Sequence, residues 1–471
     1  MYLSFKIKLK NNLFLLFLYS ITYFMNRQLL SLVLVVLLFL LDIYIFQLIK
    51  TFTLTANETT RKIAHSIYWG INFLTLGGIV VYNFYPPDQI PYTFRQSLLT
   101  WAFMLYIAKI FGALFLIIDD IIRLFTWAYH KINPSAIAEI VEKTPQNTEE
   151  VQDTTNKIPR SEFLMKAGVV AMATPLVTLS WGIVSGAHDY TVRKKTIILP
   201  NLPKAFDGIK MVQISDVHSG SFYNKKAVEG GIDLIMKQKP DVILFTGDLV
   251  NNMAKEMKDY QDIFSKLKAP MGVYSTLGNH DYGDYVRWET PAAKRKNLED
   301  LKQTHGKMGW KLLMNEHHFL ETNNEKIALI GIENWGAKGN FARHGDLEKA
   351  YQGTQDAPVK ILLSHDPSHW DAQVNGSKAH LYKDHFDQQN IQKRAFKDID
   401  LTLAGHTHGM QFGIDTEVFK WSPVQYMYEQ WADLYKHENQ YLYVNRGFGY
   451  LGYPGRVGIL PEITVLELKS A

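Results

Sequence analysis

The sequence predicts an α/β fold in which a sandwich of two sheets, flanked by helices, follows an N-terminal multi-helix transmembrane region. Up to about residue 185 the apolar residues form long unbroken runs, and beyond it they form short runs between polar, glycine-rich turns and amphipathic helical stretches. Most short runs are almost continuously apolar, which is typical of strands covered on both faces. The expected parts are transmembrane helices over 1–132, a polar linker over 133–162, a last span and connector over 163–195, and the sandwich domain over 196–471.

Four apolar runs are long enough to cross a bilayer, which requires roughly 20 mostly apolar residues in a helix. They are Gln28–Ile49, Ser66–Tyr85, Ser97–Ile118 and Lys166–Gly186, the last of which contains Pro175. A shorter run, Leu13–Met25, fits either a fifth span or an extension upstream of a start at Met25 rather than Met1. We therefore expect a multi-pass membrane protein with four or five spans.

Basic residues are distributed unevenly between the two sides of these spans. With five spans, one side carries Lys6, Lys8, Lys10, Lys50, Arg61, Lys62, Arg123, Lys131, Lys157 and Arg160, and the other carries Arg27 and Arg95. Because the basic side is normally cytoplasmic, the sandwich domain is expected on the outer, non-cytoplasmic face. A start at Met25 leaves this orientation unchanged.

Two features of the first third have no assigned function. Asp42 and Lys109 lie within apolar runs, where they could pair across helices, line a polar path, or face protein or a thinned bilayer. The segment Asn133–Lys157 is polar and nearly free of aromatic residues, so it is expected to be a flexible linker.

Composition excludes several classes of partner and site. The net charge of +4 is small for 471 residues, so a nucleic-acid partner is not expected. The chain contains no cysteine, which excludes disulfides and thiolate metal sites.

Five of the predicted strands end in residue types that bind metals. Strands are expected in "GIKMVQISDVH", "DVILFTGDL", "GVYSTLGNHD", "KIALIGIEN", "VKILLSHDP", "DLTLAGHTHG", "QYLYVNRG" and "EITVLELK", and helices in Lys226–Gln238 and Lys255–Leu267. The strand-end residues are Asp216, His218, Asp248, Asn279, His280, His365, His406 and His408. Any one of them alone is more often a turn residue or a buried core histidine. Their joint placement predicts a metal site, and nitrogen and oxygen donors without sulfur favour manganese, iron or zinc.

The ordered motifs "SDVHSG", "FTGDLV", "LGNHD", "LLSHDP" and "GHTHG" closely resemble those of the calcineurin-like metallophosphoesterases, from about Gly208 onward. The segments "APMGVYSTLGNHD" and "YVNRGFGYLGYPGRVGILPEITVLEL" resemble the membrane-anchored bacterial branch of that family. The resemblance implies two divalent metal ions. Asp216, His218 and His408 would hold the first, Asn279, His365 and His406 would hold the second, and Asp248 would bridge them. It also implies that His280 faces the substrate as acid or phosphate-oxygen partner, with Asp281 orienting it.

This chain departs from the family pattern at two positions. Met410 follows "GHTHG" where relatives often carry a second glycine, and Ser161 replaces the second arginine of a twin-arginine export signal. Neither departure removes an implied ligand.

The implied activity is hydrolysis of a phosphoester or pyrophosphate bond by metal-bound hydroxide, with a phospholipid or lipid-linked compound among the candidate substrates. The alternative is a non-catalytic, membrane-tethered sensor of a phosphate ligand, which predicts missing metal ligands. Two further features allow more than one reading. The aromatic stretch Val418–Lys436 could rest on a bilayer, wall the cleft or form a structural flap, and Arg446 could contact phosphate or serve a buried structural role.

Overall fold

The computed structural model describes residues 29–85, 90–132, 161–339, 341–378, 380 and 396–471. It divides into two compact units, Met1–Leu179 and Ser180–Ala471. The predicted run Leu13–Met25 and almost all of the predicted linker over 133–162 lie outside the described residues, as does the choice between Met1 and Met25.

The first unit consists of long apolar helices. Four helices have the length and composition to cross a membrane: Leu29–Phe52, α2 (Glu58–Phe84), the segment Thr93–Ile132 of α3 (Tyr92–Ile132), and a segment Glu162–His188 that begins with α5 (Glu162–Val184). They correspond to the four predicted spans, which are therefore confirmed as candidate transmembrane helices. Pro175 lies inside α5, as expected from its position in the predicted span.

Asp42 and Lys109 form a buried ion pair within the first unit. The Lys109 Nζ lies 2.5 Å from Asp42 Oδ1 and 2.5 Å from Asn72 Oδ1, and Tyr106 donates to Asp42 Oδ2 at 3.2 Å. Only 2% of the Lys109 side chain and none of the Asp42 side chain is exposed. Of the three readings of these charges, pairing across helices is the one that the structure shows.

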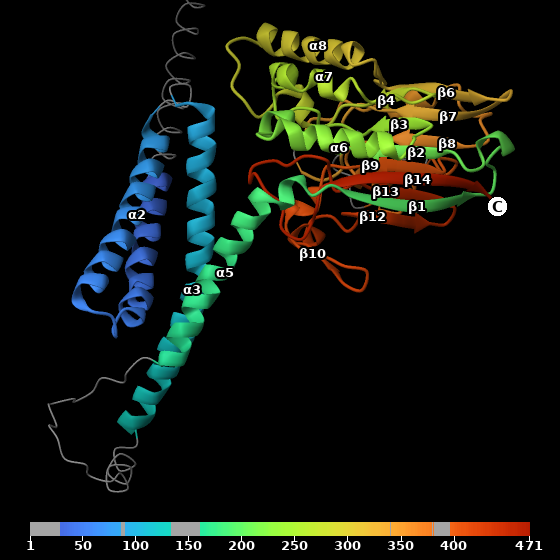
Figure 1. Cartoon of the computed structure of the whole chain (residues 1–471). Helices are drawn as coiled ribbons and strands as arrows, with labels where there is room; N and C mark the ends of the chain where they lie inside the picture. Colours follow the sequence, from blue (N-terminus) through green and yellow to red (C-terminus); the bar gives the residue numbers. More distant parts are fainter. Residues whose placement is uncertain (1–28, 86–89, 133–160, 340, 379, 381–395) are drawn as a thin grey trace, which may run out of the picture. The chain divides into compact units, whose positions relative to one another are not determined.

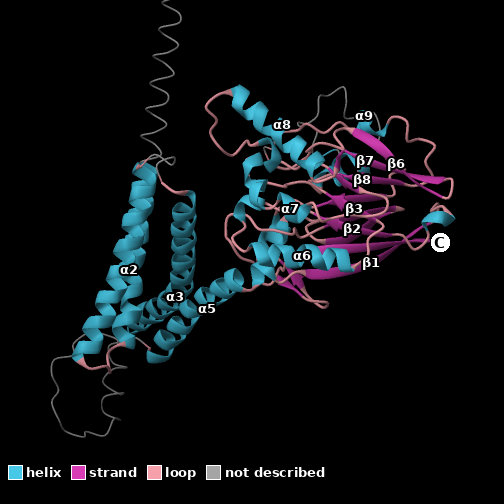
Figure 2. Ribbon diagram, turned by 45° about the horizontal axis from the view of Figure 1, so that its top comes forward, coloured by secondary structure: helices cyan, strands magenta, loops and turns pink. Residues whose placement is uncertain are grey.

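The second unit is a sandwich of two six-stranded sheets (Figures 1 and 2). The first has the order β1-β14-β2-β3-β4-β5, and the second has the order β12-β13-β9-β8-β7-β6. The strands of the first sheet are β1 (Thr191–Leu199), β14 (Glu462–Ser470), β2 (Lys210–Ile214), β3 (Val242–Phe245), β4 (Val273–Ser275) and β5 (Lys311–Leu312). Those of the second are β12 (Asp433–His437), β13 (Gln440–Val444), β9 (Leu401–Ala404), β8 (Lys360–Leu363), β7 (Glu325–Gly331) and β6 (Glu316–Thr322). This mixed α/β sandwich confirms the predicted fold class.

Burial on both faces explains why the central strands read as continuous apolar runs. Met211 and Leu244 of the first sheet share one core cluster with Leu329 and Ile361 of the second. Alternate residues of the same strands point the other way. Val212 of β2, for example, belongs to a second cluster with residues of the helix α6 (Lys225–Lys237), and the outer face of the second sheet is covered by a third cluster.

The structure differs from the predicted elements in several places, and strands β6 and β12 are among those that were not predicted. The expected helix Lys255–Leu267 is divided into a 3-10 segment, η5 (Ala254–Asp259), and the short helix α7 (Gln261–Phe264). Its amino end is tied to the preceding loop by Glu256, whose carboxylate accepts backbone N–H groups there. Strand β1 begins before the predicted domain start at 196, and helix α8 (Pro291–Lys307) was not predicted. The sequences of β1 and α8 are rich in polar residues, so the apolar periodicity that would indicate a strand or a helix is weak in both.

We expect substitution of Lys109 by methionine to destabilise the membrane unit by about 3–5 kcal/mol, because the buried Asp42 carboxylate would lose its cation. The double variant Asp42→Asn/Lys109→Met should recover part of this loss. Thermal unfolding of the full-length protein in detergent measures the effect. The matched control is Lys62→Met, which removes an exposed pair with Glu58 and should change stability by less than about 1 kcal/mol. Equal losses in the single and double variants would contradict the prediction.

Candidate metal centre

The five motif-bearing strands end at one edge of the sandwich. Strands β2, β3 and β4 are parallel neighbours in the first sheet, and β8 and β9 are parallel neighbours in the second. The loops that follow them therefore emerge on the same side within each sheet, where ligands of α/β folds commonly bind. Backbone bonds link neighbouring loops within each sheet, from Asp216 N to Gly247 O and from Gly405 N to His365 O. Across the two sheets, His406 N donates to the Asp216 carboxylate at 3.0 Å.

Most candidate ligands occupy a strained backbone conformation. Asp216, His218, Asp248, His406 and His408 all have φ between 48° and 70°, in the left-handed region. Residues other than glycine rarely adopt this conformation, which costs about 1–3 kcal/mol and is found mainly at functional sites. The strain is concentrated at the strand ends where the sequence predicted metal ligands.

The first group of potential donors contains Asp216, His218 and His408. Their ligand atoms lie within 4.8 Å of one another, and all three residues are buried. The His408 Nε2 is 3.2 Å from Asp216 Oδ1, and the Nε2 atoms of His218 and His408 are only 3.0 Å apart. A buried carboxylate and two imidazole nitrogens thus converge on one point.

The second group contains Asp248, His365 and His406, with Asn279 beside it. The His365 Nδ1 donates to the carbonyl of Thr246 at 2.8 Å, which leaves its Nε2 directed at Asp248 Oδ2, 3.1 Å away. The His406 Nδ1 lies 2.9 Å from Asn279 Oδ1 and 3.3 Å from His365 Nε2.

Second contacts hold His406 and Asn279 in these orientations. Tyr428 donates to Asp366 at 3.2 Å, so its oxygen can accept from His406 Nε2 at 3.0 Å, which leaves Nδ1 as the free acceptor. Asn279 donates through Nδ2 to the Tyr285 hydroxyl at 2.8 Å, which turns its Oδ1 toward His406. The His406 Nδ1 and the Asn279 Oδ1 are thus both acceptors that face each other, and a cation bound by both would relieve their repulsion.

Asp248 links the two groups. Its Oδ2 lies 3.1 Å from His365 Nε2 in the second group and 3.5 Å from His218 Nε2 in the first. Its Oδ1 accepts the backbone N–H of His280 at 2.8 Å. The sequence resemblance implied a bridging position for Asp248, and the structure places its carboxylate between both groups.

The charges of the cluster also fit bound cations. Burial would raise the pKa of Asp248, but His365 and the neighbouring imidazoles outweigh burial and hold the pKa well below its usual range. Burial would lower the pKa of His365, yet Asp248 and its other partners raise that pKa to about 10. The carboxylates thus favour positive charge in this buried place, which divalent cations would supply. The residues present fit divalent metal ions.

Two glycines permit the close approach of the loops. A Cβ at Gly278 would overlap the Asp248 carboxylate, and a Cβ at Gly405 would overlap Ser215 Oγ and the Asp216 carboxylate. Any larger residue at either position would therefore displace a candidate ligand.

His280 lies at the rim of the cluster without belonging to either donor group. Its Nδ1 donates to the carbonyl of Asn251 at 2.8 Å, which leaves Nε2 available. Its ring is 4.9 Å from that of His218 and 4.4 Å from that of Tyr285. This is the half-buried position expected for a proton donor next to, but outside, a metal site.

Asp281 does not contact His280 in the way the sequence resemblance implied. Its two carboxylate oxygens accept backbone N–H groups of Gly278, Asp248, Leu249 and Val250. The orienting contact to the His280 ring comes from the Asn251 carbonyl instead. The difference arises because the buried loop after β3 turns its N–H groups inward, and these donors require acceptors.

Several supporting residues were missed by the sequence reasoning: Asn251, Tyr285, Asp366, Tyr428 and Arg456. Arg456 is buried, with its Nη2 3.3 Å from His408 Nδ1. Asp366 lies in the motif "LLSHDP", Arg456 lies in the closing segment that resembles the membrane-anchored branch, and Tyr428 lies in the aromatic stretch Val418–Lys436, but none of the three was given a role. Asn251 and Tyr285 lie outside the quoted motifs.

The structure also shows the surroundings of Arg446 and Met410, the two residues whose roles the sequence left open. Arg446 is fully buried and pairs with Glu462 at 2.7 Å and Asp415 at 2.9 Å, which supports the structural reading. Met410 occupies a left-handed position, with φ of 54°, and its side chain is half exposed. A glycine would fit that backbone with less strain.

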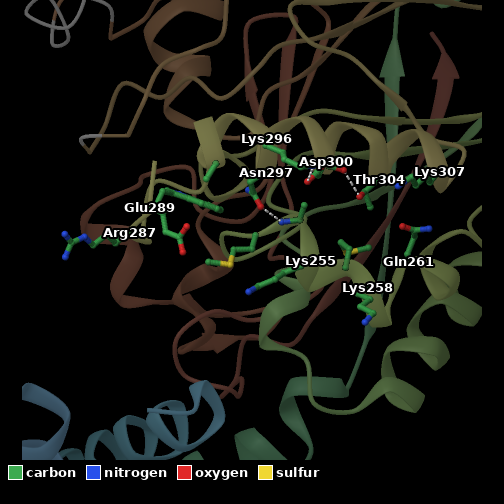
Figure 3. Close-up of a pocket in the computed structure, with 15 residues that line it drawn as sticks. Lys255, Lys258, Gln261, Arg287, Glu289, Lys296, Asn297, Asp300, Thr304 and Lys307 are labelled. Carbon is green, nitrogen blue, oxygen red and sulfur yellow. Dashed lines mark hydrogen bonds and ion pairs between the residues drawn. The ribbon is translucent and has the colours of Figure 1, made fainter. Parts of the chain in front are cut away.

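A pocket of about 680 Å³ lies beside the loop that follows Asp248. Figure 3 shows Asn297 and Asp300 of α8 on one wall and Lys255 and Lys258 on the facing segment. None of the candidate metal ligands lines this pocket. One of its lining residues, Met253, follows Asn251 by two positions in the chain.

Comparison with known proteins identifies the parts. Residues 26–187 match the family model described as "Probable Calcineurin-like phosphoesterase, transmembrane domain", and residues 209–410 match the model described as "Calcineurin-like phosphoesterase". A "Transmembrane protein with metallophosphoesterase domain" from Danio rerio is 29% identical over 310 residues, covering 64% of this chain and 63% of that protein. This chain thus spans less than two thirds of that relative.

A bacterial relative matches over almost its whole length. The "Uncharacterized metallophosphoesterase YkuE" of Bacillus subtilis (strain 168) is 29% identical over 324 residues, which cover 67% of this chain and 99% of that protein. Among solved structures, the phosphopantetheinyl hydrolase PptH of Mycobacterium tuberculosis aligns with 46% of this chain and 89% of that chain, at 13% identity and a TM-score of 0.25, too low to support an argument. The two family matches together span most of the chain, which thus carries a calcineurin-like phosphoesterase domain after a transmembrane domain of the kind found with it.

Proposed function

We propose that this membrane protein hydrolyses a phosphoester or pyrophosphate bond at a centre that holds two divalent metal ions. The observation that carries the proposal is the pair of buried donor groups joined by Asp248. Asp216, His218 and His408 would hold one ion, and Asn279, His365 and His406 the other. The oxygen and imidazole donors suit manganese, iron or zinc.

When bound, two divalent ions neutralise charge on phosphoryl oxygens and lower the pKa of a water molecule that attacks phosphorus. The protein's own residues provide the proton and the alignment. The His280 Nε2 would hold the proton that a leaving alkoxide needs, and the Asn251 carbonyl fixes the ring for that transfer. Asp281 would act as a positioning residue, because its four backbone contacts hold the loops that carry Asp248 and His280.

The membrane attachment supports a phospholipid or a lipid-linked phosphoester as substrate. The pocket that includes Met253 is a candidate for the part of an anionic substrate beyond the scissile bond, since its five basic lining residues, Lys255, Lys258, Arg287, Lys296 and Lys307, outnumber the acidic Glu289 and Asp300. The rival function, a non-catalytic sensor, predicts missing metal ligands. All seven implied ligand positions are filled in this chain.

The first test is the substitution Asp248→Asn, which weakens the charge shared by both donor groups. We expect activity on an aryl phosphodiester in Mn²⁺ to fall by about a hundredfold or more, because the ions supply several kcal/mol of transition-state stabilisation. Bound metal, measured by elemental analysis, should fall with it. The control is Asp400→Asn, at the opposite end of β9 from His406, where the carboxylate accepts the N–H of Lys360. Full activity in Asp248→Asn would refute the proposed centre.

A second test separates proton donation from metal binding. His280→Ala should retain near-normal metal content while turnover of an alkyl phosphodiester falls by about 10²–10⁴-fold. The loss should be much smaller for a nitrophenyl ester, whose leaving group needs no proton. His317→Ala, on the strand β6, serves as the control. Metal loss in His280→Ala, or equal losses for both esters, would mean that the proposed role is wrong.

A third test concerns orientation. We propose that the phosphoesterase domain lies on the non-cytoplasmic face, because the basic loop residues fall on the opposite side of the spans. An alkaline phosphatase fused to the C-terminus should be active in cells, and a green fluorescent protein exported through the same route should be dark. The reverse pattern would place the domain inside the cell.

A further inference from the structure

Exposed apolar side chains are concentrated in one segment of the second unit. Among the described residues from 186 onward, ten large apolar side chains are exposed, and seven of them come from the segment 410–427. They are Met410, Phe412, Ile414, Val418, Phe419, Tyr426 and Met427, which we call the apolar hairpin surface. Val418 is 98% exposed. Such a concentration is typical of an interaction site rather than of ordinary scattered surface residues.

The segment forms a defined hairpin. Strand β10 (Ile414–Asp415) pairs antiparallel with β11 (Lys420–Trp421). Its loop is closed by three hydrogen bonds between Thr416 and Phe419, of 2.9 to 3.0 Å. Figure 1 shows this hairpin, labelled at β10, standing out from the body of the sandwich.

The hairpin is firmly supported from beneath. Asp415 of β10 pairs with the buried Arg446 at 2.9 Å and with Arg193 at 2.5 Å. The segment that follows rests on a small apolar cluster that includes Val424 and Trp431. The exposure of the apolar hairpin surface therefore does not result from a poorly folded loop. Its side chains are presented outward by a rigid support.

Backbone bonds connect the base of the hairpin to the end of a candidate membrane span. The last turns of α5, from Ser180 onward, belong to the second unit, and the candidate span extends from Glu162 to His188. Arg456 N donates to Gly182 O at 3.1 Å. Val457 N donates to Gln411 O at 2.8 Å, and Gly413 N donates to Val457 O at 2.9 Å. The hairpin base is thus separated from the span by a single intervening segment of chain.

We propose that the apolar hairpin surface inserts into the headgroup region of the bilayer that the protein spans. A bilayer fits better than another protein because the hairpin base is joined by backbone bonds, through Arg456 and Val457, to Gly182 in the last turns of a candidate span. Tyr426 favours the boundary between lipid and water, and Glu417 in the loop limits insertion to that boundary rather than the hydrocarbon interior. Tyr428, next to Met427, contacts His406 at 3.0 Å, so the metal centre lies directly behind this surface.

The absence of native cysteine makes a direct test possible. Full-length Val418→Cys and Tyr426→Cys variants, each carrying a nitroxide spin label, are reconstituted in vesicles of equal parts phosphatidylethanolamine and phosphatidylglycerol. Collision rates with oxygen, which enters lipid, and with a water-soluble nickel chelate are compared. We expect both labels to show several-fold higher oxygen-to-nickel ratios than a label at Ile198→Cys. Ile198 is also an exposed apolar residue and lies on β1, outside the apolar hairpin surface.

Two results would overturn the proposal. Ratios at 418 and 426 equal to that at 198 would show that the surface lies in water. Dipolar broadening between labels on two copies, lost on dilution with unlabelled protein, would show that a second chain covers it instead. The inference rests on membrane attachment and not on hydrolysis. Activity on the soluble aryl ester, measured on the same vesicles, therefore reports separately on the proposed function.

Discussion

The site depends on one buried carboxylate, that of Asp248, which faces imidazoles of both donor groups. Placing an anion at the point where two sheets meet is costly unless cations surround it. Here the compensation comes from His365, whose pKa is raised beside Asp248, and, we propose, from two metal ions. The left-handed backbone at Asp248 and at four other candidate ligands is a consequence, since only tightly turned loops bring these side chains to one place.

Such turned loops would be unstable without acceptors for their inward N–H groups. Two further acidic residues supply these acceptors. Asp281 accepts from the residues at and after Asp248, and Glu256 accepts from Asn251 and its neighbours. Asn251 is consequently held still, and its carbonyl can fix the ring of His280. Asp281, the acid of the "GNHD" motif, therefore stabilises the backbone that carries the candidate ligands. The ring of His280, which Asp281 was expected to orient, is oriented by the main-chain carbonyl of Asn251.

The sequence was informative where a local pattern carries the structure. Runs covered on both faces revealed the central strands, and long apolar runs revealed the spans. The motifs after β2, β3, β4, β8 and β9 predicted which side chains would gather, because parallel strands deliver their ends to one edge. The contacts of Asp281, the partner of His280 and the role of Tyr428 could not be predicted. They depend on the paths of loops that are distant in sequence, which no periodicity encodes. Strand β1 and helix α8 were missed because their polar faces dominate their composition.

The position of the metal centre behind an apolar surface bears on the kind of substrate that the protein can use. Removing a lipid from a bilayer costs about 0.8 kcal/mol for every methylene group exposed to water, which becomes prohibitive for two acyl chains. A soluble phosphoesterase acting on lipids would have to supply this free energy or act only on the few lipid molecules dissolved as monomers in water. If the hairpin lies in the headgroup region, a lipid phosphate can reach His406 and His280 while its acyl chains remain in the membrane. Soluble nucleotides gain nothing from that arrangement. The insertion proposed for the apolar hairpin surface would therefore favour a lipid or lipid-linked phosphoester over a freely diffusing one.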